Sequence, residues 1–173
     1  MSGTTIILLR LIHILSGVFW VGSVLFVARF LMPALRAIGP ASGPVMQQLT
    51  QVRKLPLFMM IVAILTILSG ITLYWQDSGG FTGAWIDSAP GRVFGLGGIL
   101  AIVAGIIGMA INTPTGRKMG ELGAAIGRSN GPPSPEQVAE IGRLQGKMYS
   151  SMQVVAVLLV LATAAMAIAR YVR

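Results

Sequence analysis

The sequence predicts an all-α fold: a polytopic membrane protein in which four transmembrane helices form an antiparallel four-helix bundle with helical cytoplasmic extensions. Of the 173 residues, 54% are apolar and 10% are charged, whereas a soluble domain carries about 25% charged residues. Four apolar segments are each long enough to cross a hydrocarbon core of about 30 Å. The chain has no Cys, which excludes disulfides and thiolate metal sites. At this length we expect a single domain, residues 1–173.

The apolar segments predict transmembrane spans at residues 6–31, 57–75, 93–111 and 154–169. We interpret the first as a permanent span and not as a cleaved signal peptide. Residues 1–5 carry no basic side chain, and the apolar region that follows is too long for a signal sequence.

The basic residues are distributed unequally between the two ends of the predicted bundle. The side that holds the loops after the first and third spans carries nine, namely Arg29, Arg36, Arg53, Lys54, Arg117, Lys118, Arg128, Arg143 and Lys147. The opposite side carries four, namely Arg10, Arg92, Arg170 and Arg173. This asymmetry predicts that the two long loops are cytoplasmic and that both termini lie outside. Because topology explains the net charge of +8, the expected partner is the lipid bilayer and not nucleic acid.

Two cytoplasmic segments carry signals for the start of a helix. Ser134-Pro135-Glu136-Gln137 has the pattern of a capping box with proline at the first helical position. It predicts a helix from Pro135 through Tyr149 into the fourth span. Ser42-Gly43-Pro44 precedes an amphipathic stretch, residues 45–54. This stretch leads into the second span, where Pro56 either kinks the helix or restarts it.

Small residues recur along one face of the third span and on the fourth. Gly98, Ala101, Gly105 and Gly108 lie at steps of three or four residues, with Asn112 one turn further. On the fourth span the corresponding residues are Ala162, Ala165 and Ala169. Such a face lets another helix approach closely. The partner is either a neighbouring helix of the same bundle or another subunit, in a homo-oligomer or a larger assembly.

A stripe on the first span contains the only His of the chain. Arg10, His13, Gly17, Trp20 and Val24 follow one another at steps of three and four residues, so they share one helix face. Ionisable groups within a span usually face the bundle interior or a cavity and are candidates for function. Two structural alternatives stay open, namely that Arg10 snorkels to the interface and that His13 donates a hydrogen bond to the next helix.

The depth of His13 in the membrane suggests a partner on the fourth span. His13 lies three residues inside Arg10, and Met166 lies four residues inside Arg170, so both are predicted at one level. An imidazole and a thioether suit haem or copper, and arginines can bind haem propionates. The predicted cofactor site comprises His13, Arg10, Gly17, Trp20, Arg92, Met166 and Arg170, with His13 and Met166 as metal ligands.

Other chemistry is sparse in the sequence. Five methionines lie toward the cytoplasmic end of the spans, namely Met32, Met59, Met60, Met109 and Met152. They are interpreted either as flexible packing or as a path for copper. No carboxylate lies within a span, and no nucleophile has a neighbouring base. The sequence therefore does not decide whether the protein is an enzyme.

Residues 9–35, LRLIHILSGVFWVGSVLFVARFLMPAL, resemble the first helix of bacterial copper-resistance-D-like (CopD-like) membrane proteins and their small uncharacterised four-helix relatives. The signature is His13-Ile14, then Trp20-Val21-Gly22, and Arg29 at the end of the helix. A more distant similarity is to the four-helix protoporphyrinogen oxidases. The resemblance implies a bacterial inner membrane and a copper or haem ligand at His13.

Two functions from different classes follow from these observations. The first is a small membrane protein with a haem or copper pocket in the outer leaflet around His13. The alternative is a non-catalytic accessory subunit of a larger membrane complex, which the small-residue faces favour. An absorption spectrum with metal analysis separates the two.

The charge asymmetry generates a prediction about topology. We expect a cysteine label placed at Ser129 to react from the cytoplasm and one placed at Gly80 to react from outside. The measurement is labelling of intact cells and of inverted vesicles with an impermeant thiol reagent. The opposite labelling pattern would refute the orientation and move His13 to the cytoplasmic half.

Overall fold

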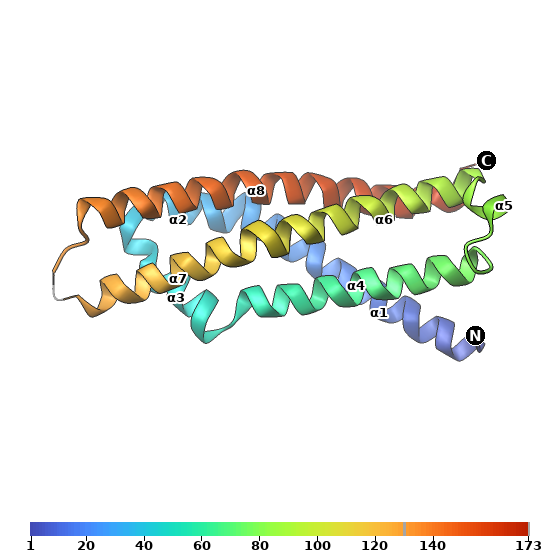
Figure 1. Ribbon diagram of the computed structural model, residues 1–173, viewed down its shortest axis with the longest axis horizontal. Helices are drawn as coiled ribbons and strands as arrows, with labels where there is room; N and C mark the ends of the chain where they lie inside the picture. The colour runs from blue at the N-terminus through green and yellow to red at the C-terminus, as the bar shows by residue number, and fades with distance from the viewer. Residues whose placement is uncertain (130, 173) are drawn as a thin grey trace.

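The computed structural model describes residues 1–129 and 131–172, and this part of the chain is helical with no β-strand (Figure 1). Four helical segments are long and apolar enough to cross a membrane: Gly3–Ile38, Leu55–Asp77, Ala89–Arg128 and Pro135–Tyr171. The predicted fold class, an all-α multi-pass membrane bundle, is therefore confirmed.

The first two segments are joined by short helices. The elements of this half are α1 (Gly3–Phe26), the π-helix η1 (Val27–Leu31), α2 (Met32–Ile38), the 3-10 helix η2 (Gly39–Ser42), α3 (Gly43–Gln47), the π-helix η3 (Gln48–Val52) and α4 (Leu55–Asp77). The elements of the second half are α5 (Gly83–Ile86), α6 (Ala89–Ile107), the π-helix η4 (Gly108–Asn112), α7 (Thr113–Arg128), α8 (Pro135–Ile168) and the 3-10 helix η5 (Ala169–Tyr171).

The long helices run along one axis, with α6 packed on α8 and α1 packed on α4. Figure 1 shows α5 and both chain ends at one end of the bundle, called the terminal end below. The elements α2, α3 and α7 and the start of α8 lie toward the other end, called the elbow end. The elbow end is the one that the charge asymmetry predicts to be cytoplasmic.

The predicted helical extensions are present at the elbow end. The Ser134 hydroxyl accepts a hydrogen bond from the Gln137 backbone N–H at 3.3 Å, and the Gln137 side-chain oxygen accepts one from the Ser134 N–H at 2.9 Å. This capping box starts α8, which continues without interruption for 34 residues. Across the loop, the Lys118 ammonium on α7 lies 2.9 Å from the Glu140 carboxylate on α8.

Between η3 and α4 the chain restarts and does not kink. Lys54 adopts a left-handed conformation, with φ 51° and ψ 36°, which an α-helix cannot accommodate. Pro56 lies in the first turn of α4, where its missing N–H breaks no helical hydrogen bond. Of the two roles predicted for Pro56, a kink or a helix restart, the structure shows the restart.

The small-residue face of α6 agrees with the predicted one in part, because Ala101 and Gly105 are buried. A Cβ atom on Gly97 would lie 3.2 Å from the Ala162 carbonyl oxygen and 3.4 Å from the Ala165 Cβ, so Gly97 is the point of close approach to α8. The predicted Gly98 and Gly108 meet no such atom within 4 Å. The close approach to α8 is therefore at Gly97 and not at the predicted Gly98.

The capping box generates a prediction about the elbow end. Ser134→Ala removes the hydroxyl that accepts from the first turn of α8, and we expect a local loss of about 1 kcal/mol. Hydrogen exchange of the amides at the start of α8 measures this loss. The matched control is Ser150→Ala, at an exposed position within the same helix, which should leave these amides unchanged. Equal effects of the two substitutions would contradict a role for the cap.

Candidate functional site

His13 lies against α4. Its Nδ1 atom is 2.8 Å from the Thr66 carbonyl oxygen and 3.4 Å from the Ser69 hydroxyl. Gly70 makes room for the ring, because a Cβ atom there would lie 2.8 Å from His13 Cε1. A neutral imidazole that donates from Nδ1 keeps its lone pair on Nε2. This interhelical hydrogen bond is the structural alternative considered from the sequence, and metal-binding histidines are commonly oriented in the same way.

The other residues of the stripe also face the bundle. Gly17 lies beside Thr66, with 3.5 Å between the Cβ position of Gly17 and Thr66 Cγ2, and the Trp20 side chain is buried. Met166, the second predicted metal ligand, packs instead on α6, where its Cγ lies 3.1 Å from the Cβ position of Gly97. His13 thus packs against α4 and Met166 packs against α6, and no described contact joins the two side chains. The ligand pair stays a prediction.

The arginines of the predicted site meet in part. Arg10 and Arg170 line one open cleft at the terminal end, together with Asp77. The Arg10 guanidinium lies 3.9 Å from the Asp77 carboxylate. Arg92, predicted at the same boundary, is not among the residues that line the cleft.

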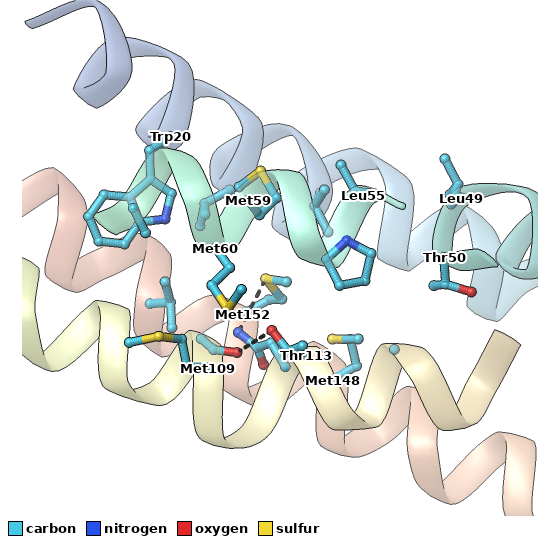
Figure 2. Close-up of a pocket in the computed structure, with 18 of the residues that line it drawn as sticks. Trp20, Leu49, Thr50, Leu55, Met59, Met60, Met109, Thr113, Met148 and Met152 are labelled. Carbon is cyan, nitrogen blue, oxygen red and sulfur yellow. Dashed lines mark hydrogen bonds between the residues drawn. The ribbon is translucent and has the colours of Figure 1, made fainter. Parts of the chain in front are cut away.

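A second cavity lies on the elbow side of Trp20, between the helices (Figure 2). Its volume is about 100 Å³. Seven of the ten methionines of the chain line it, namely Met32, Met46, Met59, Met60, Met109, Met148 and Met152. We call it the methionine cavity.

Five of these methionines stand out in the sequence at the cytoplasmic end of the spans, whereas Met46 and Met148 are additional. Met148 precedes Met152 by four residues, a spacing that places both side chains on one face of a helix. That signal was available in the sequence. Met46 lies in α3. The position of this short helix depends on how the connection between the first two spans folds back on the bundle, and no local sequence pattern predicts it.

All three π-helices of the described chain contribute to the methionine cavity. The lining includes Val27 and Leu31 from η1, Leu49 and Thr50 from η3, and Gly108, Met109 and Asn112 from η4. The hydroxyl of Thr113, the first residue of α7, donates to the carbonyl of Gly108 in η4 at 3.1 Å. π-Helical turns are rare and occur frequently at functional sites, so their gathering around one cavity marks it as the candidate site.

Asn112 supplies the unusual polar group of this cavity. Its Nδ2 donates to the Met152 sulfur at 3.6 Å. Its Oδ1 is buried and accepts no hydrogen bond from a described residue. A buried acceptor without a donor costs about 1–3 kcal/mol. The amide therefore orients one thioether while its oxygen is available to a bound group.

Comparisons of the chain with protein-family models, with curated proteins and with solved structures find no match.

The unpaired oxygen of Asn112 generates a prediction. Asn112→Leu keeps a similar side-chain shape and removes the buried acceptor, so we expect the ligand-free protein to become about 1 kcal/mol more stable. The matched control is Gln145→Leu, because that buried amide donates to the Leu35 carbonyl at 3.3 Å and to the Ser42 hydroxyl at 3.2 Å.

Thermal unfolding in detergent, followed by circular dichroism, compares the two variants. Gln145→Leu should destabilise the protein because it leaves buried groups without partners. If Asn112→Leu destabilises it equally, the Asn112 amide serves the fold and not a ligand.

Proposed function

We propose that the protein binds one monovalent copper ion in the methionine cavity. The observation that carries the proposal is that seven methionines line one cavity. Thioethers are soft ligands, and soft ligands select monovalent copper over the hard cations that prefer carboxylate and water. The resemblance of the first helix to CopD-like proteins, which stays a prediction, implies the same metal.

The arrangement of the sulfurs supports an ion shared between helices. Met60 on α4, Met109 in η4 and Met152 on α8 line the methionine cavity from three different elements, and Figure 2 shows these three residues around it. The hydrogen bond from Asn112 Nδ2 to the Met152 sulfur holds that thioether in place and leaves a sulfur lone pair for a metal. Hydrogen bonds of this outer kind are a common feature of metal sites.

The size of the cavity favours an ion over the other cofactor considered, haem. A cavity of about 150 Å³ is large enough for benzene, and the methionine cavity has about 100 Å³. A porphyrin does not fit this space. The lining contains no charged side chain, so a bound ion keeps its full charge in an apolar surrounding. Because the cost of burying an ion rises with its charge, a singly charged ion suits this cavity best.

The proposal places the metal away from His13. With the elbow end in the cytoplasm, the methionine cavity lies in the cytoplasmic half of the bilayer, and the site predicted around His13 lies in the outer half. The membrane proposed is the bacterial inner membrane, as the resemblance implies. Copper at His13 and Met166 is the competing location.

The alternative function is a non-catalytic subunit of a larger membrane assembly. It is favoured by Gly98, which has no neighbouring side chain within 4 Å of its Cβ position. This glycine leaves part of the surface of α6 open to another helix. A purified protein that binds no copper and remains associated with other membrane chains would support this function.

The metal proposal generates a prediction with a matched control. Met148→Leu with Met152→Leu removes two sulfurs from the methionine cavity and nearly conserves volume. Loss of an outer hydrogen bond at a metal site weakens metal affinity about 10–100-fold. Loss of two ligands should weaken copper binding at least as much. The control is Met166→Leu, which removes a thioether outside the cavity and should leave copper binding unchanged.

Competition with a chromogenic chelator of monovalent copper, under reducing conditions, measures the affinity and stoichiometry. X-ray absorption tests for sulfur ligands. If His13→Ala or Met166→Leu abolishes binding while the double Leu variant keeps it, the ion is in the terminal half and the cavity proposal is wrong. If the wild-type protein binds no copper, the subunit function replaces both.

A further inference from the structure

The cleft at the terminal end combines cations with an apolar wall. Its lining comes from five elements and comprises Arg10, Asp77, Trp85, Pro90, Phe94 and Arg170. We call it the terminal cleft. Its volume is about 480 Å³, several times that of the methionine cavity.

The charges of the terminal cleft favour an anion. The lining contains two arginines and one aspartate, so its net charge is positive. The distance of 3.9 Å between Arg10 and Asp77 exceeds the about 2.7–2.9 Å of a direct charge-assisted hydrogen bond. The N–H donors of Arg10 therefore remain available to a ligand. A planar guanidinium matches the oxygens of a phosphate group particularly well.

The apolar wall places the terminal cleft at the membrane surface. The Trp85 ring stacks on Phe94 with 6.4 Å between the ring centroids, and Tyr74 packs edge-on against Trp85 at 5.0 Å. Trp and Tyr side chains are enriched at the level of the lipid headgroups. The two arginines thus lie at the depth where lipid phosphates lie.

The helix surface next to Arg10 favours a lipid over a free anion as the ligand. Leu11 and Ile14 have exposed fractions of 50% and 56%, and Ile14 follows Arg10 by four residues, on the same helix face. On the other side of the cleft, Ile168 beside Arg170 is also exposed. Only a ligand with both a phosphate and hydrocarbon chains uses the cationic cleft and these apolar faces together.

We infer that the terminal cleft binds the headgroup phosphate of an anionic phospholipid. Arg10 and Arg170 bind the phosphate oxygens, the ring of Trp85 covers the glycerol region, and the acyl chains lie along the apolar face of α1. A zwitterionic choline lipid brings a cation into a cleft that is already positive, so the site prefers a lipid with a net negative charge. This inference is independent of copper binding, which concerns a different part of the bundle.

The test uses the full-length protein in mixed micelles of phosphatidylglycerol and phosphatidylcholine, and native mass spectrometry counts the lipids retained. We expect the wild-type protein to retain one phosphatidylglycerol in preference to phosphatidylcholine. Arg10→Gln with Arg170→Gln should reduce this preference at least about fivefold, as expected for lost cations near an anionic lipid. The matched control is Arg92→Gln, which removes an arginine of the third span outside the cleft and should keep the preference.

The remaining outcomes overturn the inference. An unchanged preference in the double variant, or an equal loss in Arg92→Gln, would show that the terminal cleft does not select the lipid. Displacement of phosphatidylglycerol by millimolar inorganic phosphate would identify a site for free anions. Circular dichroism of each variant confirms that a lost preference reflects the site and not unfolding.

Discussion

The constraint on which this structure depends is that lipid cannot hydrogen-bond to the backbone, so every span must satisfy its own N–H and C=O groups. That requirement makes the spans helical and makes any departure from regular helix notable. The departures in α1 and α6 take the form of π-helices, η1 and η4. A π-turn keeps backbone hydrogen bonds while it inserts an extra residue. The spans can therefore widen around the methionine cavity without exposing backbone groups to lipid.

Half-buried His13 and buried Asn112 are two polar side chains with different partners in the same bundle. The His13 ring bonds to the Thr66 carbonyl and fits into the space left by Gly70, so its polar group has a partner within the chain. Asn112 has a partner for its nitrogen but none for its oxygen among the described residues. In a low-dielectric interior an unpaired acceptor is costly. The buried oxygen of Asn112 is therefore an atom that a bound group would stabilise.

The sequence predicts what is encoded locally and misses what depends on helix rotation. The lengths of the apolar segments, the capping box at Ser134 and the helix start near Pro56 are local patterns, and the structure contains them. The choice of Gly97 over Gly98 depends on a small rotation of α6, which spacing alone does not specify. The gathering of methionines from several segments depends on the rotation of all of them and on three π-helices that have no sequence signature. The pairing of His13 with Met166 stays a prediction, because equal depth alone does not place two side chains on facing sides of their helices.

The positions along α1 show why the candidate sites are separable. Arg10, His13 and Trp20 follow one another on a helix that rises about 1.5 Å per residue, so Trp20 lies roughly 10 Å deeper than His13. Trp20 is buried and lines the methionine cavity, and its ring lies 3.6 Å from the Cβ position of Gly105 on α6. The indole thus forms the terminal-side wall of the cavity, with His13 on its other side. A ligand in the methionine cavity and a ligand at the terminal cleft consequently contact different residues of the same helix, and each can be removed by substitutions that leave the other in place.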